Sequence, residues 1–307
     1  MKTVNCKGLD ISTLSLGTVQ LGMNYGINNA SGKPDTETSN AILNLATESG
    51  INVLDTAGSY GDSELVIGNW LKTVEPGKRP FIVTKVTGFT PGTYPAVKAF
   101  LQEKVALSKQ RLGVEQLDML MLHNFDEYLR DPDNIRQAME ELKADGDIRF
   151  TGASAYTHHD YGAIAATGFD ATQIPVNLFD WSQMENGGMK KLEDSGMIVF
   201  ARSVYLQGLV FADPDQLPSK MAFARDTLVK FRDLYQAYNL TPATLALSYV
   251  SSLSAVTSLV LGCETTQQVQ DNVDLINRCV TLSPAQLSEI HSCFVDTPPR
   301  LLNPGLW

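Results

Sequence analysis

The sequence predicts a closed (β/α)₈ barrel, and two observations support this fold class. Short apolar runs alternate with helical patterns along the 307 residues, and eight strand–helix units can be counted from Leu14 onward. The runs are apolar throughout, as expected of strands that are covered on both faces. Eight units in about 250 residues is the count for a closed barrel. A doubly wound sheet is the alternative, but the chain lacks the G-x-G-x-x-G turn typical of that fold.

The elements follow in a regular order. Residues 1–13 predict a hairpin, 14–20 a first buried strand and 22–34 a turn-rich loop, after which Asp35 can cap a helix that runs to about Ser49. The other strands are expected at 51–55, 81–85, 118–122, 150–154, 172–177, 197–201 and 258–262. Their helices are expected at 63–72, 94–112, 133–145, 158–167, 186–195 and 219–238, and the last begins at 265–268 with a capping box.

The end of the chain differs from the repeating units. Residues 284–293 predict one more helix, and the prolines of 296–307 predict an irregular tail that wraps across a face of the barrel. Neither a linker nor a repeat divides the chain. We therefore expect residues 1–307 to form one barrel domain.

Composition excludes several classes of function. The net charge of −10 makes the chain a poor partner for nucleic acid or an anionic membrane surface, and no apolar run is long enough to span a bilayer. A helix start can still hold a phosphate locally. The four cysteines form no C-x-x-C pair and have no histidines at zinc spacing. We expect reduced thiols, no metal and a cytoplasmic monomer, because the chain also lacks a signal peptide and a long exposed apolar stripe.

Titratable side chains follow three successive strands. Asp55 ends one strand and Tyr60 lies in the next turn, while Lys85 and His123 end the two strands that follow. Because the carboxyl ends of barrel strands meet at one face, we expect the four side chains to lie together. Asp55 can pair with a buried Lys85, and the lysine would lower the pKa of Tyr60. Asp62 or Ser63 can cap the following helix.

This set of residues favours proton transfer to a carbonyl oxygen. It includes neither a strong nucleophile nor a metal-ligand shell, so a hydride would have to come from a cofactor. Tyr60 can give and take the proton, and His123 can hydrogen-bond the carbonyl. A lyase that forms a Schiff base on Lys85 is an alternative, although pairing with Asp55 would keep the amine protonated. Taken singly, each of the four residues also has a purely structural interpretation.

Motifs along nearly the whole chain closely resemble the aldo-keto reductases. The most specific is Asp55-Thr-Ala-x-x-Tyr-Gly-x-Ser-Glu64. Shorter ones are Leu16-Gly-Thr18, Thr84-Lys85, Leu122-His123, Gly152-Ala-Ser154, Gln173-x-x-x-Asn177, Leu206-Gln-Gly-Leu209 and Leu261-Gly262. The resemblance implies a barrel that binds NADP(H) or NAD(H) and interconverts a carbonyl compound and an alcohol. It implies Tyr60 as the general acid/base. A nucleotide-binding regulatory subunit of a membrane channel is the alternative within the family.

The resemblance also implies a set of cofactor residues. Ser154 and Gln173 would hold the nicotinamide carboxamide, and the loop from Ser203 to Gly208 would lie along the pyrophosphate. Residues near the adenosine would be Gln268, Asp271 and Asn272. The other residues placed against the cofactor are Gly17, Thr18, Asp55, Arg202, Val204, Leu206, Gln207, Gly262 and Glu264.

Two positions depart from the family pattern. Arg202 stands where many members stack an aromatic ring on the nicotinamide; its planar guanidinium can stack too, lie at the surface or grip an acidic substrate. Residues 262–268 contain no Lys or Arg for the 2′-phosphate of NADP. Glu264 would repel that phosphate and can accept hydrogen bonds from ribose hydroxyls, or simply favour a helix start. NADP is the family's usual cofactor, whereas the residues of this segment do not favour its binding.

The substrate pocket is implied to lie among the loops after strands one, four and seven and the tail. The residues there are Gln20, Tyr25, Asn124 and Phe125, with Tyr205, Arg300 and Trp307 in the same region. This mixture of polar and aromatic side chains suits a sugar-like or small oxygenated carbonyl compound.

Overall fold

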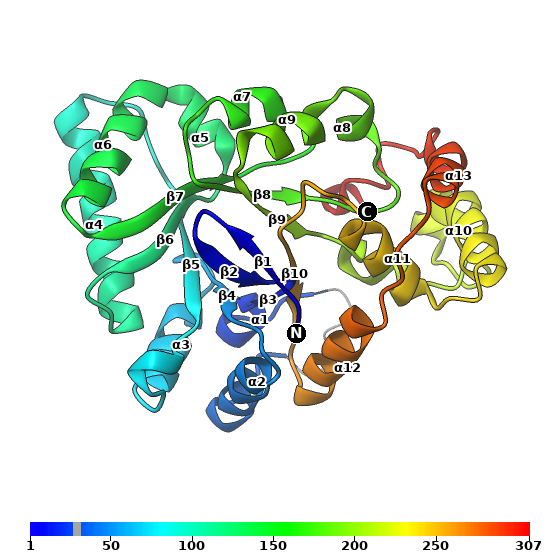
Figure 1. The fold of residues 1–307 in the computed structure, drawn as a ribbon, viewed down its shortest axis with the longest axis horizontal. Helices are drawn as coiled ribbons and strands as arrows, with labels where there is room; N and C mark the ends of the chain where they lie inside the picture. The colour runs from blue at the N-terminus through cyan, green and yellow to red at the C-terminus, as the bar shows by residue number, and fades with distance from the viewer. Residues whose placement is uncertain (27–31) are drawn as a thin grey trace.

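A closed barrel of eight parallel strands forms the centre of the protein. The computed structural model describes residues 1–26 and 32–307, and residues 27–31 of the expected turn-rich loop lie outside this description. The strands follow the order β10-β3-β4-β5-β6-β7-β8-β9, which confirms the predicted fold (Figure 1). They are β3 (Leu14–Gly17), β4 (Val53–Asp55), β5 (Phe81–Val86), β6 (Leu117–Leu122), β7 (Ile148–Ser154), β8 (Ala171–Pro175), β9 (Ile198–Arg202) and β10 (Ser258–Gly262).

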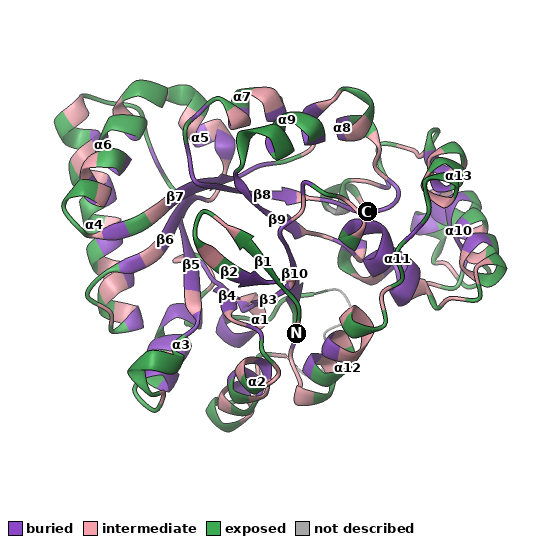
Figure 2. Cartoon of the chain, in the orientation of Figure 1, coloured by how far each residue is buried: buried purple, intermediate pink, exposed green. Residues whose placement is uncertain are grey.

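Helices surround the barrel at most of the predicted positions. These are α2 (Thr36–Glu48), α3 (Ser63–Leu71), α4 (Tyr94–Leu112), α6 (Pro132–Ala144), α7 (Tyr161–Ala165), α9 (Gly188–Ser195), α10 (Arg225–Ala237), α12 (Thr266–Asn277) and α13 (Pro284–Phe294). Asp35 caps α2 as predicted, since its side chain accepts the N–H of Thr38. In Figure 2 the barrel strands are mostly buried and the outer faces of the helices are exposed, so the core lies between the two layers.

In the described parts of the chain, four helices and a series of 3₁₀ turns are not indicated by the sequence pattern. The missed helices are α1 (Val19–Gly22), α5 (Phe125–Arg130), α8 (Ser182–Glu185) and α11 (Pro242–Ser251). The 3₁₀ segments are η1 (Pro76–Lys78), η2 (Leu206–Phe211), η3 (Ser219–Ala224) and η4 (Pro304–Leu306). The expected long helix over 219–238 therefore begins as η3 and continues as α10. Most residues of α11 are buried, and a helix that is apolar on nearly every side lacks the periodicity that would reveal it.

The capping box expected at α12 is only half formed. Thr265 accepts the N–H of Gln268 as predicted, but the Gln268 side chain accepts the N–H of Glu264 rather than that of the cap residue. A complete box caps α13 instead, where the side chains of Ser283 and Gln286 each accept the other's backbone N–H. In α12 the Gln268 amide is thereby turned toward Glu264.

The N-terminal hairpin closes one end of the barrel. β1 (Thr3–Cys6) and β2 (Leu9–Ser12) pair antiparallel through a turn in which Lys7 and Gly8 both have positive φ, which confirms the predicted hairpin. Ile11 is buried in the same cluster as residues of the barrel interior such as Val53, and the hairpin crosses the middle of the barrel in Figure 1. Val53 begins β4, so the hairpin covers the amino ends of the strands and leaves the carboxyl ends for ligands.

The tail after α13 is mostly irregular, as expected, apart from η4. Its residues bind one another: Trp307 Nε1 donates to the Arg300 carbonyl at 3.0 Å. The Arg300 guanidinium carbon lies 4.4 Å from the centroid of the Phe223 ring. These contacts tie the tail to the η3 region. None of the helices in the described parts of the chain is both long and apolar enough to cross a membrane.

Candidate active site

A buried ion pair lies at the carboxyl end of the barrel. Lys85 Nζ is 2.6 Å from Asp55 Oδ1, and the two side chains are 0% and 6% exposed. Lys85 also donates to the Thr56 carbonyl at 3.0 Å, and Gln173 Nε2 donates to the same Asp55 oxygen at 2.8 Å. These bonds compensate the two buried charges. They also occupy the Lys85 ammonium and shield it from solvent, which does not support its use as a Schiff-base nucleophile.

Tyr60 and His123 complete the group that is predicted to carry out proton transfer, and we call this group the catalytic centre (Asp55, Tyr60, Lys85 and His123). Lys85 Nζ lies 5.1 Å from the centroid of the Tyr60 ring. The rings of Tyr60 and His123 meet edge to face with their centroids 5.4 Å apart. His123 Nδ1 is 3.1 Å from Ser59 Oγ, within hydrogen-bond distance. The structure thus brings together all four residues that the strand ends indicated.

Burial controls the protonation of both rings. It raises the pKa of Tyr60, and the positive charges of Lys85 and Arg202 lower it by less. The expectation of a lowered Tyr60 pKa is therefore wrong, because desolvation outweighs the lysine. Such a tyrosine stays protonated at neutral pH and can act as a proton donor. Burial also lowers the pKa of His123 to about 4, so its imidazole is neutral at pH 7.

A close backbone contact fixes the turn that carries Tyr60. The Gly58 N–H donates to the Lys85 carbonyl, and the Ser63 N–H donates to the Tyr60 carbonyl, both at 3.0 Å. A Cβ at Gly22 would lie 1.7 Å from the Tyr60 carbonyl oxygen. Only glycine fits where α1 crosses this turn, so α1 and the catalytic turn are held against each other.

The residues before α3 do not cap it as expected. Asp62 makes no capping bond, and its carboxylate accepts from Lys33 Nζ at 2.7 Å. Ser63 is the first helical residue, and its Oγ donates to the Thr18 carbonyl at 2.9 Å. Thr56 Oγ1 donates to Ser63 Oγ at 2.9 Å. These buried hydroxyls tie the end of β3 to the end of β4.

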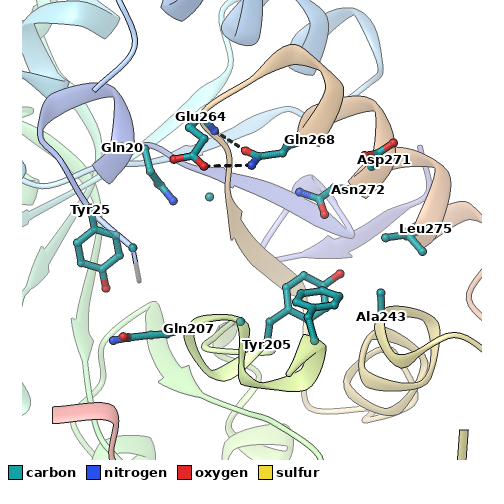
Figure 3. A pocket seen from close by; sticks show the side chains of 14 residues that line it. Gln20, Tyr25, Tyr205, Gln207, Ala243, Glu264, Gln268, Asp271, Asn272 and Leu275 are labelled. Atoms are coloured by element: carbon teal, nitrogen blue, oxygen red, sulfur yellow. Dashed lines mark hydrogen bonds between the residues drawn. The ribbon is translucent and has the colours of Figure 1, made fainter. Parts of the chain in front are cut away.

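An acidic cavity of about 470 Å³ opens where β3 and β10 end and where the loop after β9 begins (Figure 3). Seven residues predicted for the cofactor line it: Gln207, Gly208, Gly262, Glu264, Gln268, Asp271 and Asn272. Gln20 and Tyr25, which were expected to contact substrate, line the same cavity. Tyr25 also affects the pKa of Tyr60, so the cavity adjoins the catalytic centre.

Two unpaired acceptors lie buried in the wall of this acidic cavity. Glu264 Oε1 accepts from Gln268 Nε2 at 3.2 Å. Glu264 Oε2 and Gln20 Oε1 are buried without a hydrogen-bond partner among the described residues. Figure 3 shows both side chains directed into the same space. Glu264 and Asp271 are the charged residues among the lining that the structure describes. Buried acceptors left unpaired are unfavourable, so this lining fits a ligand with hydroxyl donors, such as a ribose.

The loop after β9 has a strained backbone beside the acidic cavity. Ser203, Leu206 and Gln207 have φ values of 61°, 44° and 53°, and Gly208 has 92°. Left-handed conformations of residues other than glycine are unfavourable by about 1 kcal/mol or more and cluster at ligand sites. Neighbouring N–H groups in such a loop form a concavity for anions. The side chains of Val204 and Leu206 are buried in the core, so only their backbone is available to a ligand.

The other predicted cofactor residues lie at strand ends. Ser154 and Gln173 are opposite each other in the pairing of β7 with β8, and Gly17 is opposite Gly262 in the pairing of β3 with β10. Thr18 is fully buried, and its hydroxyl donates to the Asp55 carbonyl at 2.9 Å. Thr18 therefore positions the strand end and has no surface available to a cofactor. Gln173 is bound to Asp55, which makes it part of the network around Lys85.

The two substrate residues predicted after β6 belong to α5. Asn124 caps this helix, because its side chain accepts the Asp126 N–H at 3.0 Å. Phe125 is 1% exposed and stacks on Tyr128 with their centroids 5.3 Å apart. The expectation that Phe125 contacts substrate is wrong, since its ring lies inside the protein. The pair resembles a loop in the sequence because α5 is short and begins soon after the strand.

A cluster of Asp126, His158 and His159 lies next to α5, with potential ligand atoms within 4.8 Å of one another. The His159 Nδ1 accepts the Tyr156 N–H at 2.9 Å. That bond places the proton of a neutral imidazole on Nε2, which lies 3.1 Å from Asp126 Oδ1. The ring therefore serves as a hydrogen-bonded brace for the loop after β7, and its geometry does not suit a metal ligand.

Some residues that line the acidic cavity are not indicated by the sequence pattern. Tyr205, expected near substrate, lines it together with Phe211, Ala243 and Leu275. Leu275 lies on the same face of α12 as Gln268 and Asn272, so the helical period could have revealed it. Ala243 belongs to α11, the helix that the periodicity does not indicate.

The eight-stranded barrel and the grouping of Asp55, Tyr60, Lys85 and His123 agree with the resemblance to the aldo-keto reductases. The Aldo/keto reductase family model matches residues 13–294, and the chain belongs to this family. Family members typically reduce small carbonyl compounds with NAD(P)H. The chain is 27% identical to the NADH-specific methylglyoxal reductase of Escherichia coli K12, over 90% of the chain and 93% of that protein.

Two further similarities concern a channel subunit and the fold. A putative voltage-gated potassium channel subunit beta of Schizosaccharomyces pombe is 23% identical over 95% of the chain and 92% of that protein. The fold is similar to that of an aldo-keto reductase from Bacillus halodurans solved in its holo form. The TM-score is 0.77 and the identity 24%, with 95% of the chain and 96% of that structure covered.

Proposed function

We propose that the protein is an NADH-dependent reductase of aldehydes or ketones in which Tyr60 donates the proton. One observation carries the proposal: a tyrosine kept protonated by burial lies against the Lys85–Asp55 pair and beside a neutral His123. When bound, a nicotinamide cofactor supplies the hydride. The protein itself then has to supply a proton and stabilise charge.

Each residue of the catalytic centre has a separate task in this proposal. The Tyr60 hydroxyl gives its proton to the carbonyl oxygen and becomes a phenolate. The Lys85 ammonium, 5.1 Å from the ring centroid, stabilises that phenolate. Asp55 holds the ammonium in place, and the neutral His123 can donate a hydrogen bond to the carbonyl. In the reverse direction the phenolate takes the proton back from an alcohol.

The acidic cavity supports NADH over NADPH. Gln20 and Glu264 offer unpaired acceptors that suit two ribose hydroxyls, and the strained loop from Ser203 to Gly208 offers backbone donors to a pyrophosphate. A 2′-phosphate would instead meet the like charges of Glu264 and Asp271. The name of the similar Escherichia coli enzyme, an NADH-specific reductase, agrees with this choice.

Replacement of Tyr60 tests the catalytic part of the proposal. We expect Tyr60→Phe to lower kcat on the order of 10³-fold, because general acid catalysis by a positioned side chain contributes about 10²–10⁴-fold. Binding of NADH should change less than about twofold. Tyr235→Phe removes a hydroxyl on α10 and serves as the control. If Tyr60→Phe kept the wild-type kcat, Tyr60 would not be the acid.

A titration tests the choice of cofactor. Tryptophan fluorescence is followed while NADH or NADPH is added to the wild-type protein, and NADH should bind at least 10-fold more tightly. Tighter binding of NADPH would contradict the proposal that Glu264 repels the 2′-phosphate. Tight binding of NADH without oxidation by any aldehyde or ketone in a broad panel would favour a nucleotide-binding regulatory subunit.

A further inference from the structure

Arg202 is a half-buried arginine without a carboxylate partner at the end of β9. Its guanidinium donates to the Ala155 carbonyl at 3.1 Å and lies 3.2 Å from Ser203 Oγ. Both partners are neutral, and the ion pairs among the described residues do not include Arg202. A guanidinium has five N–H donors, so several remain for another acceptor.

The loop after β7 holds this guanidinium in place. The guanidinium carbon lies 4.7 Å from the centroid of the Tyr156 ring, which forms a platform beneath it. The Tyr156 N–H donates to His159, whose ring is bound to Asp126. The Ala155 N–H donates to the Gln173 carbonyl at 2.8 Å. Arg202 is therefore fixed by contacts that leave its charge unneutralised.

The charge of Arg202 acts on the catalytic centre. It lowers the pKa of both Tyr60 and His123, so the guanidinium lies within electrostatic reach of both rings. Lys85 and Asp55 neutralise each other, and His123 is uncharged at pH 7. Arg202 thus leaves the catalytic centre with a net positive charge, although the whole chain carries −10.

We propose that Arg202 binds an anionic oxygen group of the substrate, a carboxylate or a phosphate, and so selects acidic carbonyl compounds. This inference rests on the proposed reductase function. A fixed planar guanidinium with free donors fits both kinds of group, because each can accept two parallel N–H bonds. Arg202 is then a specificity residue, while Tyr60 performs the proton transfer on neutral and anionic substrates alike.

Binding measurements test the inference independently of turnover. Isothermal titration of the NADH complex compares 4-(hydroxymethyl)benzoate with benzyl alcohol, which differ only in the carboxylate. We expect wild-type protein to bind the anion at least 10-fold more tightly, and Arg202→Gln to reduce that ratio on the order of 10- to 100-fold. Arg202→Lys should retain part of it. Arg136→Gln, at an exposed arginine of α6, is the matched control and should leave the ratio unchanged.

Turnover measurements then distinguish carboxylate from phosphate as the preferred anion. They also test the role of Arg202 separately from the reductase function. The kcat/KM for glyceraldehyde 3-phosphate against glyceraldehyde reports on phosphate, and that for 4-carboxybenzaldehyde against benzaldehyde reports on carboxylate. In Arg202→Gln the loss should fall mainly on KM for the anionic member of one pair. Turnover of the neutral aldehydes by the wild-type enzyme tests the reductase function separately.

Three results would overturn the role of Arg202. The wild-type protein could bind charged and neutral ligands equally, or Arg202→Gln could keep the full preference for the anion. Alternatively, Arg202→Gln could weaken NADH binding while the substrate ratio stays the same. That last result would assign the guanidinium to the cofactor pyrophosphate instead.

Discussion

The catalytic centre and the acidic cavity adjoin each other but are built in opposite ways. In the catalytic centre, Lys85 and Gln173 both bind Asp55, and the Lys85–Asp55 pair is closed to solvent. In the acidic cavity, buried acceptors of Gln20 and Glu264 remain unpaired among the described residues. A fully paired polar network holds its groups in one geometry before a ligand arrives. Unpaired acceptors indicate where a ligand has to supply the missing donors.

The same two regions differ in charge. Arg202 leaves the catalytic centre positive, whereas Glu264 and Asp271 make the acidic cavity negative. One loop joins them, since the segment that begins at Arg202 reaches the cavity at Tyr205 and Gln207. The difference suggests that selection of an anionic substrate and rejection of a phosphorylated ribose come from opposite ends of one surface. Substitutions that disturb the paired region should lower stability, and those in the unpaired region should alter binding.

The largest effect is expected from breaking the buried pair. Lys85→Met leaves the Asp55 carboxylate buried without its cation, and we expect a loss of about 3–5 kcal/mol in the free energy of unfolding. Urea denaturation followed by circular dichroism measures it. The double variant Lys85→Met/Asp55→Leu removes both charges and should recover much of the loss. A loss below about 1 kcal/mol for the single variant would show that the centre is not a buried, fully paired network.

Two glycines provide the next comparison. A Cβ in Gly22→Ala would lie 1.7 Å from the Tyr60 carbonyl oxygen, whereas in Gly262→Ala it would lie 2.5 Å from the Gln20 side-chain amide. Backbone cannot move aside as a flexible side chain can. We expect Gly22→Ala to lower stability by about 3 kcal/mol and Gly262→Ala by less than about 1 kcal/mol. Thermal unfolding measures both. Gly262→Ala should instead weaken NADH binding, and equal losses of stability would contradict the contrast.

The pH dependence of stability sharpens the description of the catalytic centre. The His123 pKa is lowered from 6.5 to about 4 in the folded protein. As the pH falls, the proton therefore binds first to the unfolded chain, and stability present above pH 6.5 is lost towards pH 4. We expect this group to account for about 2–3 kcal/mol, which His123→Asn should lack. Urea denaturation at pH 7 and pH 4.5 measures the difference. His291→Asn, at a half-buried ring bound to Glu185 and stacked on Trp181, is the control, and a similar effect there would contradict the assignment.

The sequence predicts a residue of the catalytic centre where that residue belongs to a local pattern, such as the end of an apolar run. Asp55, Lys85 and His123 end apolar runs, and barrel topology then brings them together. The raised pKa of Tyr60 was not predictable, because burial depends on how α1 and the catalytic turn pack. The prediction for Phe125 fails because α5 is short and only His123 and Asn124 separate it from its strand.

The acidic cavity illustrates the same limit. Gln268, Asp271 and Asn272 were found through a motif, and α12 places them on one face. That Gln20 would join them depends on the pairing of β3 with β10 across the closed barrel, a contact between the two ends of the chain. Local sequence patterns carry no direct signal for such a contact. These patterns also do not reveal that one carboxylate oxygen of Glu264 is unpaired, because this depends on the orientation of the Gln268 side chain.

The smallest effect is expected from neutralising the acidic cavity. Glu264→Gln removes the charge that opposes a 2′-phosphate and keeps an acceptor for a ribose hydroxyl. We expect the free energy of unfolding to change by less than about 0.5 kcal/mol. The ratio of the Kd values for NADPH and NADH should fall about 10-fold, or about 1.4 kcal/mol, as like-charge repulsion is lost. Fluorescence titration measures the ratio. Asp274→Asn removes an acid from the same helix outside the cavity lining, where Asp274 accepts from Gln270, and should leave the ratio unchanged. An equal fall in both variants would mean that the overall charge of α12, rather than the unpaired oxygen of Glu264, distinguishes the two cofactors.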